Sequence, residues 1–237
     1  MTFIQGFVAA VPTANQDAYR DHAAAALPLF KDFGARRMVE GWGDDVPVGK
    51  VTDFQGAVQA RDDETVVFSW VEYPNQATYA AAMAAMMNDP RMQDMPEMPF
   101  DGKRMIFAGF DPILDEGSGG TTGYVDGFLL PVAPEKKDAF YEMAHRAAAV
   151  FLDHGATRVV EAWGDDIPEG KYTDFNRAVK ATNGEKVVFS WVEWPSRAVR
   201  DAGQESVRTD PRMQSPGEMP FDAMRMTYGG FRTILDQ

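Results

Sequence analysis

Apolar and polar positions follow the periods of strands and helices in one order that occurs twice: strand, helix, strand, irregular segment, strand, helix, strand. In the second half, an apolar stripe at helical spacing predicts a helix over 134–154. The segment from Lys186 to Trp194 is apolar at nearly every position, which predicts a strand covered on both faces. The other predicted elements are strands over 124–131, 158–163 and 225–235, a short helix capped by Thr173 or Asp174, and a helix that begins after Ser196.

The two halves carry one sequence pattern, offset by 121 residues without a gap. Val66 to Glu72 recurs as Val187 to Glu193, for example. The first copy differs at His22, which stands where the second has Met143, and at Pro28, which predicts a kinked helix. We therefore predict two domains, residues 1–115 and 124–237, joined by a flexible linker over 116–123.

The order β-α-β-β-α-β is that of ferredoxin-like domains, in which helices cover one face of a four-stranded sheet. The other face also needs a cover, and a second copy of the same sheet supplies one through a two-fold contact. Because both copies are on one chain, we predict an α+β fold in which repeat 1 packs on repeat 2. The two sheets then face each other in a pseudo-two-fold α/β barrel with the helices outside.

Four linked motifs carry a family resemblance. The run Gly164 to Lys171, the strand Val187 to Val192, the segment Pro195 to Ala198 and the run Met219 to Asp222 resemble the YbaA-like family. These are small bacterial proteins of unknown function in the dimeric α/β-barrel superfamily, and the resemblance implies a fusion of two family members. The superfamily includes cofactor-independent monooxygenases, haem-handling proteins and small lyases or isomerases, so fold analogy selects no reaction.

The amino-acid composition limits the classes of partner that the protein can bind. The formal net charge of −13 argues against nucleic acid and against an anionic membrane surface. No apolar run approaches the roughly 20 residues of a spanning helix, and the N-terminal sequence lacks the features of a signal peptide. The chain contains no cysteine, which excludes disulfides and thiolate nucleophiles and fits a reducing compartment. We expect a cytoplasmic protein with a small-molecule ligand; the sequence leaves further homo-oligomerisation open.

Glu40 and Glu161 are the candidate catalytic residues. Alternation along the second strand of each repeat places them on the same face as Trp42 and Trp163. A carboxyl group beside an indole in a covered sheet is desolvated, its pKa is raised, and it can act as a general acid or base. The other interpretation is a strand-end glutamate that reaches solvent or pairs with an arginine.

Trp42 and Trp163 are candidate ligand-binding residues, which line a pocket for a flat apolar ligand or pack the sheet. The other candidate ligand-binding residues also occur in matched pairs. Ser69 and Ser190 either open room for a ligand or bond to a neighbouring group. Arg104 and Arg225 either bind an anion or form an internal ion pair. Asp45 and Asp166 either belong to a turn or bind a cation. Glu72 and Glu193 are predicted to be strand-end surface charges.

The sequence predicts no metal ion and no cofactor. His22, His145 and His154 have no partners at matched positions, and calcium-loop spacing is absent. His22 faces inward by helical phase, where a lone histidine is expected to be a satisfied core residue.

Three hypotheses remain open. The first is a small-molecule-binding barrel of unknown ligand. The second is a cofactor-independent enzyme, monooxygenase- or isomerase-like, with a buried glutamate as the base. The third is an oligomerisation module that uses the Ala- and Met-rich helix Ala80 to Met87, which is expected to be buried on more than one side.

Overall fold

The computed structural model describes residues 2–92, 94–120, 122–182, 184–214 and 218–237; Thr121, in the expected linker, lies outside them. In these ranges the strands are β1 (Phe3–Pro12), β2 (Arg37–Asp45), β3 (Glu64–Tyr73), β4 (Ile106–Gly117), β5 (Tyr124–Val132), β6 (Arg158–Gly164), β7 (Lys186–Trp194) and β8 (Thr227–Asp236). The α-helices are α1 (Gln16–Asp32), α2 (Phe54–Ala57), α3 (Gln76–Met86), α4 (Lys137–Asp153), α5 (Phe175–Ala178) and α6 (Arg197–Thr209).

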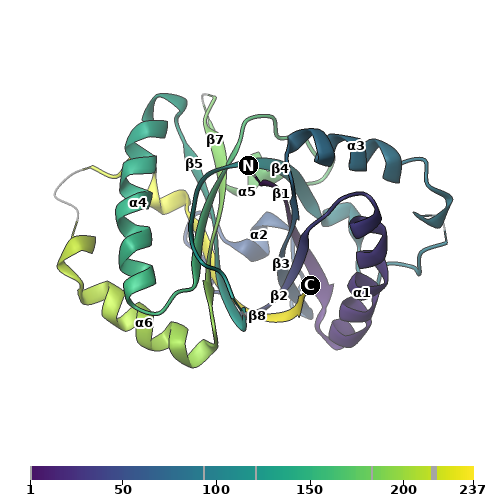
Figure 1. Ribbon diagram of the computed structural model, residues 1–237, viewed down its shortest axis with the longest axis horizontal. Helices are drawn as coiled ribbons and strands as arrows, with labels where there is room; N and C mark the ends of the chain where they lie inside the picture. The colour runs from purple at the N-terminus through teal and green to yellow at the C-terminus, as the bar shows by residue number, and fades with distance from the viewer. Residues whose placement is uncertain (1, 93, 121, 183, 215–217) are drawn as a thin grey trace.

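The strands form one closed barrel in the order β1-β3-β2-β8-β5-β7-β6-β4, with antiparallel neighbours. The last strand of each repeat is shared: β4 pairs with β1 of its own repeat and with β6 of the other, and β8 pairs with β5 and β2. Helices α1 and α3 lie on one side of the barrel and α4 and α6 on the opposite side (Figure 1). The predicted α+β fold is confirmed.

Several local predictions are also confirmed. Strand β7 has the predicted bounds and is buried along nearly its whole length. The Ser196 side chain accepts a hydrogen bond from the Val199 amide at the start of α6, and Asp174 caps α5 in the same way. Strand β4 extends to Gly117 and thus includes the first two residues of the expected linker. Within the described residues, no helix is both long enough and apolar enough to cross a membrane.

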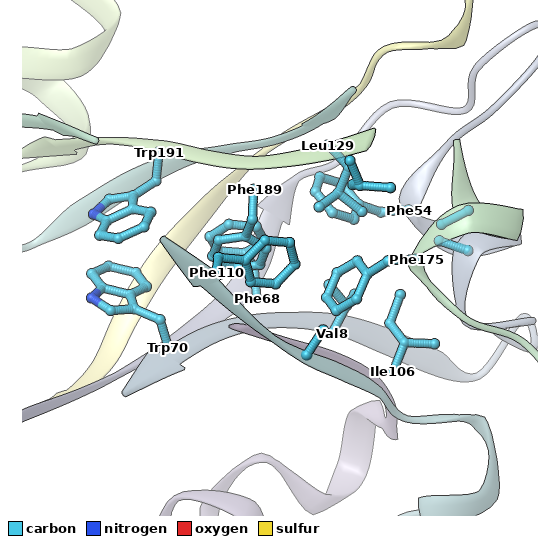
Figure 2. Close-up of a cluster of buried hydrophobic side chains, with 14 of the residues drawn as sticks. Val8, Phe54, Phe68, Trp70, Ile106, Phe110, Leu129, Phe175, Phe189 and Trp191 are labelled. Atoms are coloured by element: carbon cyan, nitrogen blue, oxygen red, sulfur yellow. The ribbon is translucent and has the colours of Figure 1, made fainter. Parts of the chain in front are cut away.

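Aromatic side chains fill the inside of the barrel. Phe68 and Phe189, which are matched positions of the two repeats, stack with ring centroids 4.4 Å apart and planes 7° from parallel. Trp70 and Trp191, also matched positions, lie against each other with centroids 4.5 Å apart and planes tilted by 31° (Figure 2). These four side chains are fully buried. The contact between the sheets is therefore a packed core, and space for a ligand has to lie elsewhere.

Gly6 and Gly127 explain how the rings fit between the sheets. A Cβ atom at Gly127 would lie 2.9 Å from the Phe68 ring, and one at Gly6 would lie 2.8 Å from the Phe189 ring. Each ring therefore packs directly on the backbone of a strand of the other repeat. The close backbone approach accounts for a glycine within these two strands.

A buried ion cluster closes one end of the barrel. Arg37 of repeat 1 binds Glu193 of repeat 2 at 2.9 Å, and Arg158 of repeat 2 binds Glu72 of repeat 1 at 2.6 Å. Glu193 has no exposed surface and Glu72 is 8% exposed, so the prediction that they are surface charges is wrong. Each lies two residues after an inward tryptophan whose indole N–H donates to it, and the two arginines neutralise charge that would otherwise be costly to bury.

Helix α3 differs from its expected environment. Ala82 and Met86 are its buried residues, whereas Ala80, Ala81 and Ala84 are exposed. Within the chain the helix is therefore buried on one side, and the prediction that it is buried on more than one side fails for the single chain.

Candidate functional site

Each repeat has a pocket between the outer face of its sheet and the helices that cover it. The repeat 1 pocket has a volume of about 510 Å³ and the repeat 2 pocket about 230 Å³. The lining is mostly aromatic side chains and methionines: among others Phe7, Phe30, Met38, Met98 and Phe100 in repeat 1, and Phe128, Phe140, Met143, Phe151 and Phe221 in repeat 2. Cavities of this kind suit apolar ligands that are oriented by a few polar groups.

Glu40 is the central polar group of the repeat 1 pocket. It projects from β2 toward α1, directly opposite Ser69 on β3. The hydroxyl of Tyr19 on α1 donates a hydrogen bond to Glu40 Oε2 at 2.6 Å, and Ser69 Oγ donates to the same oxygen. Glu40 Oε1 accepts no hydrogen bond from the residues that the structure describes. One carboxylate oxygen is thus held by two donors, and the other has no donor among the described residues.

Burial changes the acidity of this group. Desolvation raises the pKa of Glu40 from its ordinary 4.5 to about 7, against the opposing effect of the hydrogen bonds from Ser69 and Tyr19. Burial also raises the pKa of Tyr19, and the neighbouring Glu40 carboxylate adds to that effect. Near neutral pH, Glu40 is therefore present in both protonation states, while Tyr19 stays a neutral donor. A carboxyl group with this pKa is suited to general acid–base chemistry.

His22 lines the same pocket from α1. Its Nδ1 atom is buried and has no hydrogen-bond partner among the described residues, so the prediction of a satisfied core histidine is wrong. Desolvation lowers the pKa of the imidazole, which is therefore neutral at pH 7. His22 thus gives the pocket a second polar group that is not committed within the chain.

The repeat 2 pocket has the same glutamate with fewer partners. Glu161 lies opposite Ser190, which donates to Glu161 Oε2, and burial raises the pKa of Glu161 to about 7. Phe140 and Met143 occupy the positions of Tyr19 and His22 and supply neither hydroxyl nor imidazole. The two pockets therefore share a carboxyl group but differ in the polar groups around it.

The predicted tryptophans lie on the same outer face as the glutamates but outside both pocket linings. Trp42 packs with Tyr19 in a small apolar cluster on the helix side of the sheet. The indole N–H of Trp163 donates to Asp165 at 2.9 Å, and the Lys137 ammonium lies 4.7 Å from the ring centroid. Both side chains support the sheet–helix contact.

Arg104 and Arg225 are engaged in internal ion pairs, which was the second interpretation of these residues. Arg104 binds both carboxylate oxygens of Glu64, at 2.5 and 2.7 Å. Arg225 binds Glu185 in the same manner, at 2.7 and 2.8 Å. These bidentate pairs tie the segments that precede β4 and β8 to Glu64 at the start of β3 and to Glu185 just before β7.

The acidic pair after each second strand has different surroundings in the two repeats. Asp45 binds Arg200 at 3.0 Å and the preceding Asp44 binds Arg197 at 2.7 Å, so both link β2 of repeat 1 to α6 of repeat 2. Asp166 is exposed. Among the described residues, no group of three or more His, Asp or Glu side chains is placed to hold a metal ion.

Sequence reasoning missed Tyr19 as a member of the site. Only the fold brings its hydroxyl onto Glu40. The one available signal was the exchange of tyrosine for phenylalanine between matched positions 19 and 140.

Each half of the chain is similar in sequence to known proteins. Residues 2–102 and 123–223 each match a family described as "Protein of unknown function (DUF1428)". The chain belongs to this family. An uncharacterised protein, YbaA of Escherichia coli strain K12, is 59% identical over 117 residues, which are 49% of this chain and 100% of YbaA. One copy of that protein thus corresponds to one half of this chain, as a tandem fusion requires.

Two solved structures have the same fold. Both are named "putative monooxygenase": one from Fusobacterium nucleatum (TM-score 0.62, 7% identity, 100% of this chain and 94% of that chain covered) and one from Lactobacillus acidophilus (TM-score 0.55, 10% identity, 100% and 96% covered). At these identities the likeness establishes the barrel architecture and nothing about the reaction.

Proposed function

We propose that this protein binds apolar small molecules outside its barrel, in the pockets between sheet and helices, and that repeat 1 takes a planar molecule with an acidic hydroxyl group. The observation that carries the proposal is Glu40: a carboxyl group with a pKa near 7 lies in a cavity lined by aromatic and methionine side chains, with Oε1 left without a donor. Because aromatic rings fill the barrel interior, these outer pockets are where a ligand fits.

The size of the pocket limits the ligand. An apolar cavity of roughly 150 Å³ holds one benzene ring, and the repeat 1 pocket is about 510 Å³. Two or three fused rings therefore fit. A hydroxyl on such a ring system donates to Glu40 Oε1, and the neutral imidazole of His22 offers a second hydrogen bond.

The test compares 2-naphthol with 2-fluoronaphthalene, which has the same shape but no donor. Methyl NMR of methionine-labelled protein locates the ligand, because Met38, Met92 and Met98 line the repeat 1 pocket. We expect 2-naphthol to bind about tenfold more tightly, as a hydrogen bond to a charged group contributes about 1.5 kcal/mol. Glu40→Leu should remove this preference and the matched Glu161→Leu should preserve it. Equal affinities of the two compounds for the wild type would refute the proposal.

A second candidate function is proton abstraction from a bound ligand. The raised pKa of Glu40 favours it. The ketone 2-tetralone has acidic C–H bonds and the size of naphthalene, so NMR in D₂O would follow exchange of its α-protons. We expect catalysed exchange whose rate rises with pH through about 7, as Glu40 ionises. Glu40→Gln should abolish it; exchange that survives this change excludes Glu40 as the base.

A further inference from the structure

The two pockets differ in charge at their rims. Arg146 of α4 lines the repeat 2 pocket, is exposed, and makes neither an ion pair nor a side-chain hydrogen bond with any described residue. Arg212 lines the same pocket, but Asp153 and Asp210 each bind it at 2.7 Å. Among the described residues that line this pocket, Arg146 is therefore the cation without a carboxylate partner.

Repeat 1 lacks this feature. Ala25 stands at the position that matches Arg146, and the described lining of the repeat 1 pocket contains neither lysine nor arginine. Its charged rim residue is Glu97, and its imidazole is neutral. The described lining of the repeat 2 pocket thus has an unpaired arginine and that of the repeat 1 pocket has Glu97, although the sheets beneath them share the same glutamate and serine.

From this contrast we infer that the repeat 2 pocket binds a small carboxylic acid with an apolar body, whose carboxylate is bound by Arg146 at the mouth. The inference rests on the proposed function and adds the chemical class of the second ligand. A guanidinium group binds a carboxylate in planar, bidentate geometry. The formal net charge of −13 repels anions from the protein as a whole, so selectivity for an acid has to come from a local cation.

The interior of the pocket determines the orientation of the acid. Phe140 and Met143 make the inner wall less polar than in repeat 1. Glu161 carries partial negative charge near pH 7 and would repel a second carboxylate beside it. The apolar body therefore points inward and the acid group outward. A volume of about 230 Å³ holds one aromatic ring with a short side chain, given that benzene occupies a cavity of roughly 150 Å³.

The test compares 3-phenylpropionate with its neutral amide, 3-phenylpropionamide. Met143, Met213 and Met226 line the pocket, so their methyl signals report its occupancy. In the wild type we expect the acid to bind about fivefold more tightly than the amide. Arg146→Ala should remove the difference and leave binding of the amide unchanged. The control is Arg208→Ala, which removes an exposed arginine of α6 outside the pocket lining and should change neither affinity.

The outcomes of this experiment separate a failure of the inference from a failure of the proposed function. If acid and amide bind equally to the wild type, or if Arg208→Ala weakens the acid as much as Arg146→Ala does, the specific role of Arg146 is overturned while the pocket stands. If neither compound shifts the signals of Met143, Met213 and Met226, both the inference and the proposed function of repeat 2 fail. Binding of 2-naphthol in repeat 1 is measured separately and is unaffected by either result.

Discussion

Tyr19 donates a 2.6 Å hydrogen bond to Glu40, and Phe140 at the matched position of repeat 2 leaves Glu161 without this donor. The backbone around the two sites follows one pattern, with each glutamate opposite a serine on the neighbouring strand. The chain therefore contains a natural comparison of a buried carboxyl group with and without a phenolic donor.

Exchanging these two side chains should shift the two pKa values in opposite directions. The bond from Tyr19 stabilises the ionised carboxylate, so Tyr19→Phe should raise the pKa of Glu40 by about one unit. Phe140→Tyr should lower the pKa of Glu161 by a similar amount. Titration of ¹³C-labelled glutamate carboxyl groups by NMR measures both values. Unchanged values in both variants would show that the phenol does not act on the carboxyl group.

The pKa of Glu40 also predicts how stability depends on pH. Between 4.5 and about 7 the folded protein keeps a proton on Glu40 that the unfolded chain releases, so the free energy of unfolding falls as pH rises through this interval. The difference corresponds to a loss on the order of 3 kcal/mol from Glu40. The pKa of Glu161 is also raised to about 7, so Glu40→Gln should keep only the part of the decrease that comes from Glu161. Urea denaturation at several pH values tests this, with the exposed Glu142→Gln as control. A Glu40→Gln variant with the wild-type pH profile would contradict it.

The ion cluster at the barrel end should be essential for stability. Arg158→Met removes the 2.6 Å ion pair of Glu72, which keeps only a 3.4 Å contact with Arg37, and the 3.4 Å contact of Glu193 with Arg158, in a buried site. We expect a loss of about 3–5 kcal/mol in the free energy of unfolding. Arg177→Met, which removes an arginine that is 45% exposed, should change it by less than about 1 kcal/mol. Denaturant unfolding of both variants provides the comparison; similar small losses would show that the cluster is dispensable.

Gly127, which packs against the Phe68 ring, should not tolerate a side chain. Gly127→Ala places a Cβ atom about 2.9 Å from that ring and forces the two sheets apart. Overpacking of this kind costs about 1–3 kcal/mol. Phe68→Leu removes the ring, so a double-mutant cycle should show that the two substitutions together cost less than the sum of the single ones. Strict additivity would mean that the clash is relieved in another way.

The sequence was sufficient to predict the repeat, the order of elements and the barrel. Period-2 and period-3.6 patterns directly reflect which faces are buried, and the copy at an offset of 121 residues supplies a cover for each sheet. Alternation also placed Glu40 on the same face of its strand as Trp42. It left open which side chains from other elements reach them, because periodicity specifies a face and not a neighbour.

Only the tertiary structure decided how the polar groups are paired. Closure of the barrel brings Arg37 onto Glu193 across 156 positions of the chain, and it turns two expected surface charges into a buried cluster. Helix packing puts the Tyr19 hydroxyl on Glu40, and the different residues on α1 and α4 make two unlike pockets from one repeated pattern. Contacts of this kind depend on distances between segments that are remote in sequence, and local hydrophobic pattern carries no information about them.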